Sequence, residues 1–149
     1  MGIFLGIDAA ASGLTAERLR MDVISNNIAN SNTTRTDRGG AYHRRYVVFE
    51  PRDREPKSFE QTLMKAVGMS RQTGEGVRAV QIAEDETQGP LVYDPGHPDA
   101  NADGYVERPN VNIVSEMVDM ITAQRAYEAN STAINSAKAM ASKALEIGK

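Results

Sequence analysis

The 149-residue sequence contains no cysteine and no tryptophan, and only 5% of its residues are aromatic. Without cysteine the chain can form no disulfide, thiolate metal site, cysteine nucleophile or iron–sulfur cluster. The apolar fraction is 40%, and alanine and methionine supply much of it. This composition favours helix-against-helix packing over a thick β-sandwich core.

Common targeting signals are also missing. Residues 1–14 have no positively charged start, and Gly6 and Asp8 interrupt the apolar stretch, so we expect no cleaved signal peptide. No run approaches the ~18 apolar residues of a membrane span. Gly6 also occupies the place where a myristoylation signal needs Ser or Thr. We therefore expect neither a transmembrane segment nor a lipid anchor.

What the sequence does contain is a seven-residue apolar repeat near its start, together with a stretch from Leu14 to Arg38 that has no Gly or Pro. This spacing predicts an amphipathic helix with one apolar seam. The repeat consists of Ile7, Leu14, Met21 and Ile28, and its intermediate apolar positions are Ala10 and Ile24.

A second repeat predicts another helix from Val111 to Ile147, which again contains no Gly or Pro. Asn112 is the predicted N-cap. Such a helix is on the order of 50 Å long, so a small subunit cannot bury it alone. It needs partners, first the N-terminal helix and then other chains. Its apolar residues recur seven apart, and other apolar residues widen this stripe. The repeat consists of Ile113, Met120, Tyr127, Ile134 and Ala141, and the widening residues are Met117, Ala123, Ala137, Ala144 and Leu145.

Amide side chains accompany both repeats. Asn26, Asn27 and Asn30 have two interpretations: they end the first helix, or they lie in the seam and fix its register. Gln124 and Asn130 lie at or near the seam of the second helix. A buried amide lowers stability but specifies how helices pair.

Between the two helices the sequence changes character. Runs of β-branched and aromatic residues at 42–49, 76–82 and 91–93 predict three or four short strands. Residues 59–69 have helical spacing and predict a short helix. Pro and Gly residues divide the stretch after residue 93 into turns.

The predicted fold class is therefore α+β. Segments 1–34 and 109–149 form a discontinuous assembly domain, in which long terminal helices pair as a coiled coil. Residues 35–108 form a small β-rich insert between them.

Charge is divided unevenly within this insert. Residues 35–57 contain seven bases and four acids, whereas residues 84–107 contain seven acids and no base. These segments could pair head to tail between copies or bind different partners, or they could be solvated loops. Because acids are mixed with the bases and the chain has a net charge of −3, we expect no nucleic-acid interface.

Two local patterns suggest chemistry. Residues 99–104 fit the first half of an EF-hand loop, but Asn110 occupies the place of the required bidentate glutamate. This loop is either a calcium-binding module or an Asx-type turn. His97 has Asp94 and Asp99 nearby, as a histidine-dependent hydrolase would need, but its flanking residues suggest an exposed loop. We expect no enzymatic activity, no cofactor and no metal site.

At both ends the sequence resembles a known family. Residues 13–33, which include Ser-Asn-Asn-Ile-Ala-Asn-Ser-Asn-Thr, resemble the N-terminal signature of bacterial flagellar rod and hook proteins. Residues 116–130 resemble the matching C-terminal signature. Residues 91–99 and 109–112 are similar to the proximal rod proteins in particular. The resemblance covers nearly the whole chain except residues 52–73.

This resemblance implies a structural subunit of the flagellar basal-body rod. Family members stack their paired terminal helices into a tube, with copies of themselves and other rod proteins, and carry a β domain outside. They reach the basal body, outside the cytoplasmic membrane, through the flagellar type III export apparatus and without a cleaved signal peptide. The implied role is a drive shaft between rotor and hook. A sister protein of the proximal rod, or another axial protein, is the alternative within the family.

Combined with the periodicity, the resemblance implies that the seam and amide residues act in subunit assembly. These are Ile7, Leu14, Met21, Ile24, Asn26, Asn27, Ile28, Asn30, Ile113, Met117, Met120, Gln124, Tyr127, Asn130 and Ile134.

Overall fold

A computed structural model of the chain describes residues 3–52, 63 and 76–147. The chain has a long helix at each end and a small β region between them in sequence, so the predicted α+β class is confirmed. The predicted short helix at 59–69 lies outside the described residues apart from Leu63. The elements in chain order are α1 (Ile3–Ala29), β1 (Arg45–Pro51), β2 (Val77–Glu84), β3 (Leu91–Tyr93), β4 (Tyr105–Glu107) and α3 (Ile113–Ile147).

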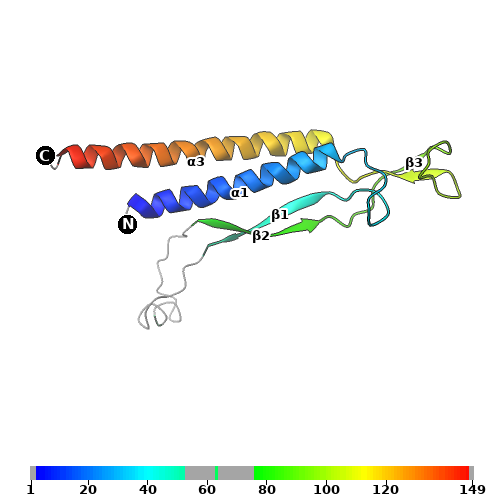
Figure 1. The fold of residues 1–149 in the computed structure, drawn as a ribbon, viewed down its shortest axis with the longest axis horizontal. Helices are drawn as coiled ribbons and strands as arrows, with labels where there is room; N and C mark the ends of the chain where they lie inside the picture. Colours follow the sequence, from blue (N-terminus) through cyan, green and yellow to red (C-terminus); the bar gives the residue numbers. More distant parts are fainter. Residues whose placement is uncertain (1–2, 53–62, 64–75, 148–149) are drawn as a thin grey trace.

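The two helices run antiparallel, side by side, with both chain termini at the same end of an elongated molecule (Figure 1). Helix α1 has 27 residues and α3 has 35. At ~1.5 Å per residue their lengths are about 40 and 52 Å. The C-terminal part of α3 therefore extends past the start of α1, where Leu145 is 76% exposed.

Local side-chain chemistry sets the helix ends. Asn112 Oδ1 accepts hydrogen bonds from the backbone N–H groups of Val114 (3.0 Å) and Ser115 (3.3 Å), which confirms the predicted N-cap of α3. Helix α1 ends at Ala29, within the predicted asparagine-rich stretch. There the Ser31 hydroxyl donates to the Ile28 carbonyl at 2.8 Å.

The described strands form two antiparallel hairpins. In the first, β1 pairs with β2 from Arg45 opposite Glu84 to Pro51 opposite Val77, with a bulge after Val48. This hairpin packs against α1 on the side away from α3, so α1 is the middle of three layers (Figure 1). The second hairpin, β3 with β4, extends beyond the start of α3. Strand β4 comes from a stretch in which the sequence predicted turns.

The buried core is small and rich in alanine. Many larger apolar side chains on α3 are exposed at the surface. Among the described helices, none is both long and apolar enough to cross a membrane. The apolar residues that are buried are Ala10, Ala16, Val23, Ile24, Ala41, Tyr42, Val106, Ala123 and Ala137.

Candidate functional site

A buried polar cluster joins α1, β1 and α3 at the end of the molecule away from the termini. Asn27 and Glu116 are both fully buried, and Asn27 Nδ2 donates to Glu116 Oε2 at 2.9 Å. The same amide nitrogen donates to the Arg45 carbonyl (2.8 Å), while Asn27 Oδ1 accepts from the Arg45 N–H (3.0 Å) and the Tyr42 hydroxyl (2.9 Å). All four hydrogen-bonding positions of the Asn27 amide are therefore occupied.

Arg44 compensates the charge of the buried carboxylate. Its Nε donates to Glu116 Oε1 at 2.6 Å, and its Nη2 lies 3.4 Å from Asp119 Oδ2. Its backbone N–H donates to Asn110 Oδ1 at 2.7 Å, on the segment that leads into α3. Burial raises the pKa of the Tyr42 phenol, so its hydroxyl remains a donor to Asn27 at neutral pH. We call Asn27, Tyr42, Arg44 and Glu116 the polar cluster.

The two interpretations of the asparagines apply to different residues. Asn27 lies in the buried contact between the helices, where its hydrogen bond to Glu116 links α1 to α3. Asn30 Nδ2 instead donates to the carbonyl and side-chain oxygens of Asn26, both at 2.9 Å, at the exposed end of α1. Asn26 and Asn30 therefore help to end the helix.

The contact face of α3 uses the small residues of the predicted stripe rather than its large ones. Residues Glu116, Ala123 and Ala137 are buried, and Asn130 between them is half-buried, so a seven-residue repeat of small or polar residues marks the seam. Met120 and Ile134 are half-buried beside it. The other α3 positions predicted for assembly lie farther out and are exposed, and these are Ile113, Met117, Gln124 and Tyr127.

On α1 the predicted seam is closer to the observed contact. Ile24 is buried, and Ile7, Leu14, Met21 and Ile28 are half-buried. None of these α1 positions is fully exposed, so the predicted apolar face is turned toward the rest of the molecule.

Gly13 allows the two helices to approach closely. A Cβ at this position would lie 2.7 Å from Asn130 Nδ2 of α3, whereas a Cβ at Gly6 would have no neighbour within 4 Å. Gly6→Ala is therefore expected to raise the free energy of unfolding by up to about 1 kcal/mol through helix propensity. Gly13→Ala is expected to lose this gain, because the Asn130 side chain must shift, and to leave the free energy of unfolding between unchanged and about 1 kcal/mol lower.

Urea denaturation followed by circular dichroism measures both values, and each glycine variant is the control for the other. Equal stabilisation by the two substitutions would show that the helices do not approach closely at Gly13.

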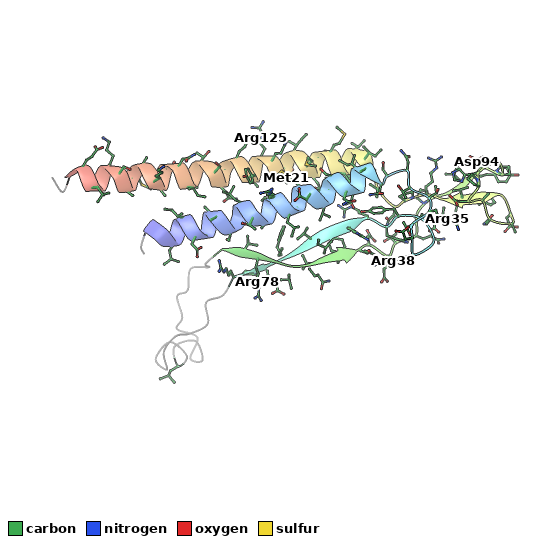
Figure 2. The ribbon with its side chains drawn as sticks, in the orientation of Figure 1. Met21, Arg35, Arg38, Arg78, Asp94 and Arg125 are labelled. Carbon is green, nitrogen blue, oxygen red and sulfur yellow. The ribbon has the colours of Figure 1, made fainter. Side chains whose placement is uncertain are left out.

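The opposite face of α3 carries an exposed apolar stripe. Val114, Met117, Val118 and Ile121 are 71%, 55%, 58% and 55% exposed and follow the spacing i, i+3, i+4, i+7. At 3.6 residues per turn, Val114 and Val118 lie about 200° around the helix from Glu116. We call these four residues the outer stripe. Arg125, one turn further along, points away from α1 (Figure 2).

Opposite charges of the insert pair within one chain. Arg45 Nη2 lies 2.7 Å and Arg38 Nη1 3.6 Å from Glu84 Oε1, and Arg35 Nη1 lies 3.6 Å from Asp99 Oδ1. The basic segment therefore meets the acidic segment of its own chain at these positions.

Asp85, in the acidic segment, is held by a neighbouring threonine. The hydroxyl and the backbone N–H of Thr87 both donate to Asp85 Oδ1, and these hydrogen bonds lower the pKa of the Asp85 carboxyl.

The loop at residues 99–104 uses its oxygen atoms internally. Asp99 Oδ2 accepts from the Thr34 hydroxyl at 2.8 Å, and Asn101 Oδ1 accepts from two backbone N–H groups farther along the loop. His97 Nδ1 accepts from the Asp99 N–H at 3.1 Å, so this nitrogen is also engaged within the loop. In the described part of the chain, no three His, Asp or Glu side chains converge as metal ligands. The hydrogen bonds that Asn101 Oδ1 accepts from the loop backbone are those of an Asx-type turn.

Two features of the site were not found from the sequence. Nothing marked Tyr42, Arg44 and Glu116 as partners, because they are separated along the chain and each is ordinary in its local context. The outer stripe had a signal, since its four apolar residues have helical spacing. That signal overlapped with the stripe assigned to the seam.

Comparison with known proteins gives matches over the whole chain. Residues 7–35 match a family described as "Flagella basal body rod protein", and residues 102–147 match "Flagellar basal body rod FlgEFG protein C-terminal". The flagellar basal-body rod protein FlgC of Borreliella burgdorferi is 51% identical over 99% of the chain and 98% of that protein. FlgC of Bacillus subtilis is 45% identical over 100% of both chains, and FlgC of Escherichia coli O157:H7 is 37% identical over 95% of both.

Proposed function

The chain belongs to the FlgC family of flagellar basal-body rod proteins, and we propose that it builds the proximal rod by packing the outer stripe of α3 against neighbouring subunits. A structural role in the rod follows from the family itself. The proposal adds two points: the surface through which the subunit assembles with copies of itself and with other rod proteins, and the contacts through which it transmits torque.

The outer stripe is the observation that supports this assembly. Helix α3 uses one face for α1 and leaves four apolar side chains, each more than half exposed, on the opposite face. A contiguous exposed apolar patch on a soluble surface is typical of an interaction site. Spacing of i, i+3, i+4, i+7 fits a second helix, so the expected neighbour is a helix of another rod subunit.

The terminal segments 1–34 and 109–149 act in this proposal as one assembly domain, with residues 35–108 outside it. Among the residues predicted for assembly, Ile113, Met117 and Gln124 are exposed on α3 and available to neighbours. The polar cluster joins β1 to both helices, so a twisting load on the helices passes into the insert. A rigid connection of this kind suits a drive shaft that transmits torque from rotor to hook.

Export through the flagellar type III apparatus, to a position outside the cytoplasmic membrane, is part of the same proposal. The chain contains no cysteine, so no disulfide opposes unfolding. Its buried core consists largely of alanine, which contributes less burial energy per residue than larger side chains. Both features favour a chain that unfolds readily for transport and buries the rest of its apolar side chains only on assembly.

Val118→Asp tests the proposal. Val118 is 58% exposed, so the free energy of unfolding of the isolated chain is expected to change by no more than about 0.5 kcal/mol. In the assembled rod the carboxylate would be buried without a partner, at a cost of several kcal/mol per subunit. Cells that depend on the variant are expected to lose motility and to yield basal bodies without a complete rod.

Val118→Ile is the matched control, because it keeps an apolar side chain at the same position. Normal motility with Val118→Asp would contradict the proposed role of the outer stripe. Loss of motility with both variants would show that shape alone, and not burial of an apolar face, decides the effect.

A further inference from the structure

We propose that the exposed aromatic face of the β3–β4 hairpin docks into a groove between α1 and β2 of a second copy of this chain. This inference rests on the proposed assembly into a rod. It adds a second contact between copies, separate from the outer stripe of α3.

The β3–β4 hairpin presents a preformed apolar face. Leu91, Tyr93 and Tyr105 are 56%, 65% and 42% exposed, while Val106 on the other face of the hairpin is buried. Tyr93 pairs directly with Tyr105, and their rings meet edge to face at 5.2 Å between centroids. A rigid aromatic pair of this kind loses little conformational freedom on binding, and tyrosine is common at the centre of interfaces.

This face lies in an acidic part of the chain. Residues 84–107 contain seven acids and no base, and Asp94 and Asp103 are exposed close to the aromatic pair. Its partner is therefore expected to offer an apolar floor together with positive charge.

The groove between α1 and β2 has both properties. Its volume is about 530 Å³, and its apolar lining includes Ala16, Leu19, Val77 and Ala79. Two arginines, Arg52 and Arg78, also line it, with side chains 53% and 64% exposed. Among the described residues each is paired with one surface carboxylate, Arg52 with Asp8 at 3.9 Å and Arg78 with Glu50 at 3.1 Å. Exposed pairs of this kind contribute about 0–1 kcal/mol, so the guanidinium groups can exchange partners.

The position of the two surfaces requires a second copy. Asp94 marks the hairpin at one end of the long axis, and Arg78 lies toward the other end (Figure 2). The hairpin of one copy therefore cannot reach the groove of the same copy. A contact between two different surfaces is heterologous, and it repeats from copy to copy as a ring or a helical array.

Disulfide crosslinking in basal bodies tests the contact, because the chain has no cysteine of its own. Cells would carry a Tyr93→Cys, Ala79→Cys double variant, and the isolated basal bodies would be oxidised. Crosslinked multimers of the chain are expected, whereas either single variant is expected to give none. The matched control replaces Ala79→Cys with Gln81→Cys, an exposed position on the same strand that does not line the groove.

A charge reversal provides a second measurement. Adding Arg78→Glu to the double variant is expected to lower the crosslink yield about fivefold, because acidic groups would then face each other. If Tyr93→Cys is unable to enter the basal body, the pair Leu91→Cys and Ala79→Cys takes its place.

The inference would be overturned by basal bodies that contain the double variant but no multimers, or by equal crosslinking at Gln81. Crosslinking of Tyr93→Cys to a different rod protein would also overturn it. None of these outcomes affects the proposed function, which fails only if the outer stripe is dispensable.

Discussion

Glu116→Ala is expected to lower the free energy of unfolding by about 3–5 kcal/mol, because it removes one partner from a buried, hydrogen-bonded ion pair. Glu116 is fully buried and accepts from Arg44 at 2.6 Å and from Asn27 at 2.9 Å. The variant leaves the Arg44 guanidinium, whose side chain is only 29% exposed, without its closest acceptor. It also leaves the Asn27 amide with one unused N–H.

Urea denaturation followed by the helical circular dichroism signal measures this loss. Glu128→Ala on the same helix is the matched control, since the Glu128 side chain is 67% exposed, and its effect is expected within about 0.5 kcal/mol. The double variant Arg44→Met, Glu116→Leu is expected to regain part of the stability, because no charge remains buried alone. Equal unfolding midpoints for Glu116→Ala and Glu128→Ala would show that the polar cluster does not hold the helices together.

Gly89→Ala is expected to lower stability by about 3 kcal/mol, because its Cβ would overlap the backbone carbonyl oxygen of Arg108. Backbone atoms cannot rotate away as a flexible side chain would. Next to this contact, Asn110 Nδ2 donates to the carbonyls of Asp85 (3.0 Å) and Thr87 (2.9 Å). The substitution would therefore separate the segments on either side of the β3–β4 hairpin.

Hydrogen exchange of the β3–β4 amides, together with thermal unfolding, measures the effect of Gly89→Ala. Gly96→Ala is the matched control in the same hairpin, because its Cβ would have only Asp94 Oδ1 nearby, at 3.7 Å. The control is expected to change stability by no more than about 0.5 kcal/mol. Unchanged protection of the hairpin in Gly89→Ala would contradict the close approach at Arg108.

Features with local causes were predictable from the sequence. The N-cap at Asn112 and the end of α1 near Asn30 depend on side chains within a few residues of the backbone groups that they bind. Strand β3 was found from its apolar run, whereas the short β4 was not. Tyr105–Glu107 becomes a strand because it pairs with Leu91–Tyr93. A segment of three residues is too short for its own sequence to show a strand pattern.

The seam on α3 shows where local patterns were insufficient. The predicted stripe contained both the large residues Met120 and Tyr127 and the small residues Ala123 and Ala137, and the small ones make the closest contact. Both sets have the same period, so the period alone does not identify the face that meets α1. The close approach at Gly13 favours small residues there, and this approach is a property of two helices together.

By itself, the sequence determined that this protein has long terminal helices, a small β-rich region between them and no cysteine chemistry. It also identified the flagellar rod family, because the signatures at both ends are contiguous in the chain. Only the tertiary structure decided which face of α3 is buried, and that Asn27, Arg44 and Glu116 form one buried cluster. The physical reason is that helix period and capping depend on near neighbours, whereas burial of a polar group depends on partners that folding brings together from distant positions.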